Sequence, residues 1–131
     1  MKLLLDTHAL LWWLWNSTRL GKEARSLIRS DDTLIWVSAA SIWEMNIKAP
    51  LGRLDRLKPF EKELRVEMER SGFRPLPVTF DHASAVSKLP LHHRDPFDRM
   101  LIAQARCEDL TLLTADPAIM AYDLRTVDAS R

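Results

Sequence analysis

The sequence predicts an α/β fold, with a short central parallel sheet covered by helices on both faces. Short, nearly continuous apolar runs alternate with longer segments of helical periodicity, and this alternation is typical of parallel sheets built from strand–helix–strand units. Because such strands are buried on both faces, they carry apolar residues in succession. The 131 residues contain no internal repeat, low-complexity tract or long linker, so we expect one domain that spans residues 1–131.

Strands are predicted where apolar residues run together between turn signals. Leu3-Leu4-Leu5 is the clearest of these runs, and residues 74–78 form a shorter one that is flanked by prolines. A weak run near the end of the chain predicts an edge strand. The expected strands are residues 2–6, 34–37, 74–78, 110–114 and 125–127.

Helices are predicted between these runs by apolar spacing and by start and stop signals. The strongest start is Asp95-Pro96-Phe97-Asp98, with Asp95 as N-cap, Pro96 at the position that needs no amide hydrogen, and Asp98 at the third helical position. Gly72 is a typical stop. The expected helices are residues 9–15, 22–30, 38–48, 59–71, 80–88, 95–108 and 117–121, with a turn at residues 49–52.

The cysteine count and the N-terminal stretch bear on the compartment. Cys107 is the only cysteine, which excludes an internal disulfide and a zinc finger and favours a reducing compartment. The apolar stretch at the N-terminus is interrupted by Asp6 and His8 and ends at Asn16, short of the roughly 20 apolar residues of a membrane span. We therefore expect a soluble, cytoplasmic protein with no membrane partner.

The net charge of +1 gives no bulk electrostatic sign of a nucleic-acid partner. The distribution is more informative, because basic side chains gather in a few segments on which a polyanion could lie. Each segment taken alone also fits a solvated helix face, which is the usual role of charges at helical spacing. The basic segments are Arg19, Lys22, Arg25 and Arg29; Arg53, Arg56 and Lys58; and His92, His93 and Arg94.

Four acidic residues stand at expected strand ends or on expected helices, namely Asp6, Glu44, Asp98 and Asp116. Ligand sites of open α/β sheets lie at the carboxyl ends of the strands, so the fold could gather these side chains. Glu44 lies on a largely apolar helix, where an unpaired carboxylate is costly and needs a partner. Gathered carboxylates would repel one another without a cation, and ligands that are all oxygen favour Mg²⁺ or Mn²⁺ over zinc.

Each of these residues also has a structural explanation as a helix cap. Asp6 could cap the helix that begins near His8, and Asp116 precedes Pro117 as Asp95 precedes Pro96. Ser41 and Glu44 match a capping box, although Ser38 competes for the cap. The case for a functional site therefore depends on the four residues as a set.

The segments that carry these residues are 3–7 (LLLDT), 37–44 (VSAASIWE), 93–105 (HRDPFDRMLIAQA) and 112–116 (LLTAD). Together and in this order they resemble the successive motifs of PIN-domain ribonucleases, and more closely those of the VapC-like toxins of type II toxin–antitoxin pairs. The resemblance covers essentially the whole chain. It implies a PIN-like fold and a Mg²⁺-dependent endoribonuclease that hydrolyses RNA phosphodiester bonds, with Mn²⁺ as a possible substitute.

The resemblance also implies roles for individual residues. Asp6, Glu44 and Asp98 match the core acidic positions and are the expected catalytic residues, and Asp116 matches a more variable fourth position. We expect Asp95 to act as a cap. The expected metal ligands are Asp6, Asp98, Glu44 and Asp116, and the polar positions beside them are Thr7, Ser38 and Thr114.

Partners follow partly from the resemblance and partly from one apolar segment. The resemblance implies a homodimer, an RNA substrate and a small antitoxin whose segment wraps the toxin and blocks its acidic site, for which a basic side chain is electrostatically favoured. Residues 10–15 (LLWWLW) are apolar on every side of the expected helix, so this helix is either deeply buried or in contact with another protein.

Other functions were weighed against this one. A catalytically silent RNA- or protein-binding PIN-like module would not need converging carboxylates. A small-molecule phosphatase of the phospho-aspartate type lacks its second aspartate, since His8 stands at that position. The histidines show no metal-binding spacing, so we expect surface or RNA-contacting roles for them. No Gly-x-Ser-x-Gly elbow supports a hydrolase triad.

Overall fold

The computed structural model of the protein describes residues 1–52 and 60–131. Within them five strands form one parallel sheet in the order β3-β2-β1-β4-β5, which confirms the predicted fold class. The central strand is the first in the chain, and it pairs with β2 on one side and β4 on the other. The strands are β1 (Lys2–Leu5), β2 (Leu34–Ser38), β3 (Arg74–Leu76), β4 (Thr111–Thr114) and β5 (Thr126–Asp128).

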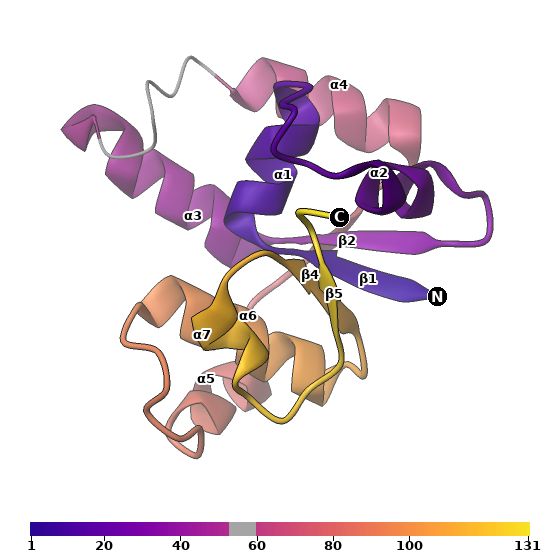
Figure 1. The fold of residues 1–131 in the computed structure, drawn as a ribbon. Helices are drawn as coiled ribbons and strands as arrows, with labels where there is room; N and C mark the ends of the chain where they lie inside the picture. The colour runs from indigo at the N-terminus through magenta and orange to yellow at the C-terminus, as the bar shows by residue number, and fades with distance from the viewer. Residues whose placement is uncertain (53–59) are drawn as a thin grey trace.

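Helices cover both faces of the sheet (Figure 1). One face carries α1 (Thr7–Leu14), α2 (Lys22–Arg29) and α4 (Glu61–Ser71), and the other carries α5 (Phe80–Val86), α6 (Pro96–Cys107) and α7 (Pro117–Met120). Between these groups lies α3 (Ala39–Lys48), which contacts both α1 and α6 and continues into a 3-10 turn, η1 (Ala49–Leu51). No helix among the described residues is long and apolar enough to cross a membrane.

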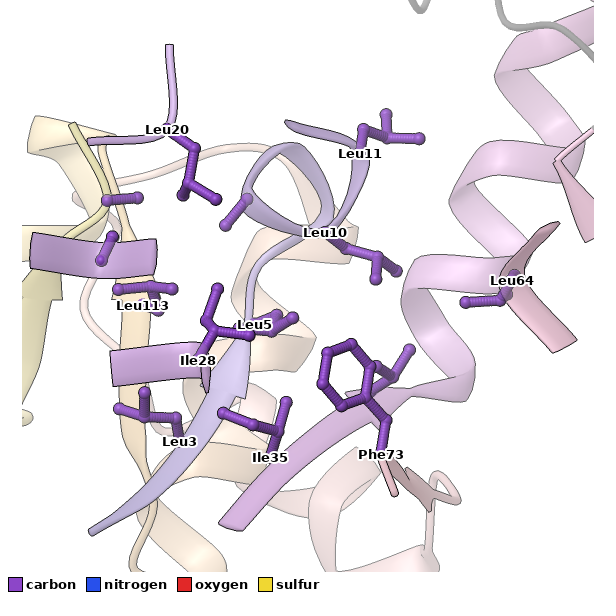
Figure 2. Close-up of a cluster of buried hydrophobic side chains, with 14 of the residues drawn as sticks. Leu3, Leu5, Leu10, Leu11, Leu20, Ile28, Ile35, Leu64, Phe73 and Leu113 are labelled. Atoms are coloured by element: carbon purple, nitrogen blue, oxygen red, sulfur yellow. The ribbon is translucent and has the colours of Figure 1, made fainter. Parts of the chain in front are cut away.

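The continuous apolar strands explain this layered arrangement. Along β1, Leu3 and Leu5 pack into the cluster under α1, α2 and α4, whereas Leu4 packs into the cluster under α5, α6 and α7. Successive strand side chains point to opposite faces, so a strand that is covered on both sides must be apolar throughout. Figure 2 shows the first cluster, where Leu10 of α1, Leu64 of α4 and the sheet side chains meet.

Most element boundaries agree with the predictions, and the differences have local causes. α1 begins at Thr7 instead of residue 9, because Asp6 caps it, and α3 begins after Ser38, which is its N-cap. The strand predicted at 74–78 is shorter, since its pairing with β2 ends at Leu76. The edge strand near the end of the chain forms as β5. The start predicted for the fourth helix, at residue 59, lies outside the described residues.

The tryptophan-rich helix is mostly packed inside the molecule. Leu10 and Leu11 are buried, and Trp13 is partly buried against Phe73, with ring centroids 6.2 Å apart. The indole Nε1 of Trp13 donates to Glu67 Oε1 at 2.9 Å, so its polar group is also satisfied. Only at the end of this stretch is a large apolar side chain exposed, that of Trp15. Of the two interpretations of residues 10–15, burial accounts for most of the segment.

The first basic segment has structural roles as well. Arg25 donates to Asn16 Oδ1 at 2.9 Å and to the carbonyl oxygen of Ser17, which ties α2 to the loop before it. The guanidinium of Arg29 lies 5.8 Å from the centre of the Trp13 ring. The segment with Arg53, Arg56 and Lys58 lies outside the described residues.

Gly21 allows the last residues to close over α2. Its amide donates to the carbonyl oxygen of Ala129, and the carbonyl oxygen of Arg131 accepts from Glu23 and Ala24 in the first turn of α2. A Cβ atom at position 21 would lie 2.0 Å from the carbonyl carbon of Arg131, which is not a possible contact.

We therefore expect Gly21→Ala to lower the free energy of unfolding by about 1–3 kcal/mol, the range for overpacking. Urea denaturation checks this value. As a control, Gly72→Ala meets no atom but keeps a positive φ of 67°, so it should cost only the left-handed strain, about 1–2 kcal/mol. An unchanged midpoint for Gly21→Ala would contradict the close approach.

Candidate active site

The predicted acidic residues converge at the carboxyl ends of the central strands. Asp6 directly follows β1, Asp116 follows β4, Glu44 lies on α3 after β2, and Asp98 lies in the first turn of α6. Asp98 lies close enough to Glu44 and Asp6 for their charges to raise its pKa, and the charge of Asp116 raises the pKa of Asp6. Residues from the beginning, middle and end of the chain thus share one acidic site.

Asp6 is one of two buried members of the set, with Glu44. Its side chain is 4% exposed, and Oδ1 accepts the amide hydrogen of Ala9 at 2.7 Å, so the residue caps α1 and also faces the site. Burial raises the pKa of Asp6 above its ordinary value, and the nearby Asp116 charge adds to this, although the Thr114 hydroxyl and the Ala9 amide oppose the shift. The cap and the site therefore use the same carboxylate.

Glu44 is buried and has the partners that its apolar helix requires. Oε1 accepts from the Thr7 hydroxyl at 2.6 Å, and Oε2 forms an ion pair with Lys48 one turn later on α3. Thr7 Oγ1 also lies 3.1 Å from Ser41 Oγ. Ser41 therefore serves the site, and the cap of α3 belongs to Ser38, as the competing interpretation held.

Lys48 places a fixed cation at the edge of the site. Its ammonium is 3.4 Å from Asp95 Oδ2 and 5.6 Å from the centre of the Phe97 ring. Burial lowers the pKa of Lys48, but the hydrogen bond and charge of Glu44 and the charge of Asp95 outweigh this and raise it above its ordinary value. Lys48 was not singled out from the sequence, although its spacing of four residues after Glu44 is the usual one for a helical ion pair.

Asp95 and Asp98 have different surroundings. Asp95 Oδ1 accepts from the amides of Phe97 at 2.8 Å and Asp98 at 3.1 Å, which is the expected cap of α6. Asp98 instead lies among other carboxylates. Burial, followed by the charges of Asp95, Glu44 and Asp6, raises the pKa of Asp98 to about 7, while His93 acts in the opposite direction.

Asp116 enters the site from the loop between β4 and α7. Its Oδ1 accepts from the Ala118 amide at 2.9 Å and so caps α7, and its own amide donates to Thr114 Oγ1 at 3.1 Å. Its Oδ2 remains for the site and lies 2.8 Å from His93 Nε2. Of the expected polar positions, Thr7 and Thr114 contact acidic residues, whereas Ser38 donates to Gln104 Oε1 at 2.5 Å.

The surface or RNA-contacting role expected for the histidines was wrong for His82, which is buried. His93 lies inside the acidic site, where Nε2 is 3.0 Å from Asp98 Oδ2 as well as close to Asp116. His82 is buried, and its Nε2 lies 2.8 Å from Glu108 Oε1. His92 packs edge-on against the Tyr122 ring at 5.0 Å. The only signal for His93 was its place two residues before the cap of α6, inside the third acidic segment.

A small cavity opens at the site. It has a volume of about 220 Å³ and is lined by Asp6, His8, Trp12, Ala115 and Asp116. Two carboxylates and two aromatic side chains thus line one opening, which could admit a phosphate and an adjoining base.

The donor set fits a divalent metal ion. Atoms of His93, Asp98 and Asp116 that could serve as ligands lie within 4.8 Å of one another. Burial is the main cause of the raised pKa values of Asp6 and Asp98, and the charges of neighbouring carboxylates add to it. A hard divalent ion would reverse the sign of these interactions, and carboxylate oxygens are its preferred ligands.

A second, larger feature adjoins the site. An apolar groove of about 700 Å³ lies between α3, α4 and β3, where its lining includes Ile42, Trp43, Leu64, Met68 and Pro75. Trp43 is 63% exposed and meets the ring of Phe97 edge-on at 5.1 Å. Trp43 lines the groove, and its ring partner Phe97 is the residue before Asp98, so this side of the groove lies near α6.

Comparison with known proteins agrees with this geometry. The PIN domain family matches residues 3–124, and the chain therefore belongs to the PIN domain family. No curated protein matches the chain.

Solved structures share the fold over nearly their whole length. VapBC2 from Rickettsia felis, bound to a DNA fragment from its promoter, has a TM-score of 0.72 at 12% identity and covers 97% of this chain and 98% of its own. A toxin–antitoxin complex from Klebsiella pneumoniae has a TM-score of 0.65 at 20% identity, with 96% of both chains covered. FitAcB from Neisseria gonorrhoeae has a TM-score of 0.64 at 21% identity, with 97% of both covered.

Proposed function

We propose that the protein is a Mg²⁺-dependent endoribonuclease that acts in the cytoplasm as the toxin of a toxin–antitoxin pair. The observation that carries this proposal is the convergence of Asp6, Glu44, Asp98 and Asp116 at one edge of the sheet. Membership of the PIN domain family supports a nuclease. RNA as the substrate and Mg²⁺ as the cofactor are inferred from the resemblance and the all-oxygen ligands.

The proposed chemistry assigns a separate task to each residue. Asp6, Asp98 and Asp116 would hold Mg²⁺, or Mn²⁺ in its place, and Glu44 would act as a further ligand or as the group that orients the attacking water. When bound, the ion supplies charge neutralisation on the phosphate and a water that loses its proton near neutral pH. Thr7 and Lys48 fix both oxygens of Glu44, so its carboxylate does not have to be reoriented during the reaction.

The proposed partner is a small antitoxin that occupies the apolar groove. Similar folds are found in toxin–antitoxin complexes, which supports a partner of this class. The groove between α3 and α4 suits an apolar segment, and the contact of its Trp43 with Phe97, the residue before Asp98, suits a basic side chain at the end of that segment. We also propose a homodimer, as the resemblance implies.

The first test of this function is metal dependence. Purified protein without antitoxin should cleave single-stranded or loop RNA in Mg²⁺ or Mn²⁺, and excess EDTA should stop the cleavage, because the carboxylates alone neither neutralise the phosphate nor activate water. Gel analysis of a labelled RNA measures this. Undiminished cleavage in EDTA would refute the metal mechanism.

The same assay separates the alternatives. Protein that binds RNA but leaves it intact with either ion would be the catalytically silent binding module. Hydrolysis of a small phosphate monoester without cleavage of RNA would indicate the small-molecule phosphatase instead.

A further inference from the structure

His93 bridges two of the carboxylates to which metal binding is assigned. Its Nε2 lies 3.0 Å from Asp98 Oδ2 and 2.8 Å from Asp116 Oδ2, so one ring nitrogen faces an oxygen from α6 and an oxygen from the start of α7. The ring is only 16% exposed. This contact connects the first turn of α6 with the start of α7, which β4 separates in the sequence.

The other ring nitrogen determines what Nε2 can do. The backbone amide of Asp95 donates to His93 Nδ1 at 3.1 Å. An amide N–H is only a donor, so Nδ1 must be the acceptor and carries no proton. The ring proton then lies on Nε2, which is hydrogen-bonded to Asp116 Oδ2 and lies 3.0 Å from Asp98 Oδ2. The same geometry argues against Nε2 as a metal ligand, because a ligating Nε2 would need the proton on Nδ1, opposite the Asp95 N–H.

The ring is also held firmly in this orientation. The His93 amide donates to the Tyr122 hydroxyl oxygen at 2.9 Å, and Arg99 contacts the same oxygen at 3.2 Å. Arg99 further donates to the carbonyl oxygens of Pro90 at 3.0 Å and Val86 at 3.0 Å, which fixes the loop between α5 and α6. The donor is therefore supported by Arg99 of α6 and by Tyr122, two residues after the end of α7.

We propose that His93 is a positioning residue of the metal site, which holds the carboxylates of Asp98 and Asp116 in place by donating its Nε2 hydrogen to Asp116 and by keeping the same nitrogen 3.0 Å from Asp98 Oδ2. This inference rests on the proposed function, since it assigns a role within that site. Two like-charged carboxylates would otherwise separate, and the donor between them offsets part of their repulsion. Each carboxylate oxygen has two lone pairs, so a hydrogen bond to Oδ2 still leaves acceptor capacity for an ion.

The size of the effect follows from similar arrangements. Groups that orient metal ligands through hydrogen bonds typically change metal affinity or activity by 10- to 100-fold when they are removed. His93→Leu should therefore weaken Mg²⁺ binding by about 10- to 100-fold. His93→Gln should retain most of the affinity, because the glutamine amide nitrogen reaches the position of Nε2 and is also a donor.

The binding experiment uses Mg²⁺ alone, without RNA. Calorimetric titration of the full chain compares wild type, His93→Leu, His93→Gln and the neighbouring control His92→Leu, whose parent side chain packs on Tyr122. The proposal expects a loss in His93→Leu, rescue in His93→Gln and wild-type affinity in His92→Leu. Wild-type affinity in His93→Leu, or an equal loss in His93→Gln, would overturn it.

A spectroscopic readout on the unaltered protein does not depend on whether a variant folds. Nitrogen-15 NMR of the imidazole should show the His93 proton on Nε2, with and without Mg²⁺. Pulsed EPR of Mn²⁺-loaded protein should show no nitrogen directly bonded to the ion. A proton on Nδ1 in the Mg²⁺-loaded protein, or a directly bonded nitrogen, would make His93 a ligand and overturn the positioning role.

These outcomes are separate from those of the proposed function. Mg²⁺ binding that depends on His93 in a protein that cleaves no RNA would remove the ribonuclease function and keep the positioning role. RNA cleavage and an unchanged Mg²⁺ affinity in His93→Leu would keep the ribonuclease function and remove the positioning role.

Discussion

Asp98→Asn should reduce RNA cleavage by at least about 100-fold, more than the loss expected from a group that only orients a ligand, whereas Asp95→Asn should keep most of the activity. The two residues lie three positions apart at the start of α6, but Asp98 is surrounded by carboxylates and Asp95 uses Oδ1 for two backbone amides. Asparagine caps a helix about as well as aspartate does. It is a much weaker ligand for a hard cation.

Asp6→Asn and Glu44→Gln should show the same large loss. Activity of each variant is measured on a labelled RNA at saturating Mg²⁺, and a thermal melt confirms that the protein is folded. If Asp95→Asn is inactive and folded while Asp98→Asn remains active, the assignment of the two aspartates is reversed. Wild-type activity in all four variants would show that these carboxylates take no part in the mechanism.

The second expected result concerns stability without metal. In the chelated protein at pH 8, Asp98→Asn should melt at the same temperature as wild type or higher, because it removes one charge from a crowded group. Burial and the charges of Asp95, Glu44 and Asp6 raise the pKa of Asp98 from 3.8 to about 7. The folded protein therefore binds this proton more tightly than the unfolded chain, so this residue makes wild type more stable as the pH falls from about 7 toward 4.

The difference between wild type and Asp98→Asn should accordingly shrink over that pH range. Comparing the two proteins cancels the titration of carboxylates outside the acidic site, which do not interact with Asp98. Added Mg²⁺ at pH 8 should then raise the melting temperature of wild type more than that of the variant, because only binding to the folded state shifts the equilibrium. A variant that is clearly less stable without metal, together with an equal Mg²⁺ shift in both proteins, would mean that Asp98 is structural.

The sequence predicts the fold well because the central strands had to be buried on both faces. Leu3, Leu4 and Leu5 are all buried, in two different clusters, and only a sheet with helices on both sides accommodates that run. Helix starts were predicted equally well where a cap is local, as at Asp95. The capping box of Ser41 and Glu44 did not form, because α3 begins earlier, at Ala39, with Ser38 as its N-cap. Thr7 of another helix contacts both side chains instead.

The site was predicted only in part, because some of its contacts join residues that are distant in the sequence. The four acidic residues were identifiable by their position at the ends of predicted elements. His93 was not, because its role depends on the amide of Asp95, the Tyr122 hydroxyl and the two carboxylates, which only the folded chain brings together. Lys48 could have been found, since its spacing from Glu44 is a local feature of a helix.

The strand order has a consequence for how the protein is made. β1 is synthesised first, but its neighbour β4 leaves the ribosome only after α6, when most of the chain is already outside. Until then Asp6 has neither the Thr114 hydroxyl nor the Asp116 carboxylate beside it, and the sheet that gathers the site lacks its central pair. The acidic site of a growing chain is therefore incomplete until β4 pairs with β1 and brings Thr114 and Asp116 beside Asp6.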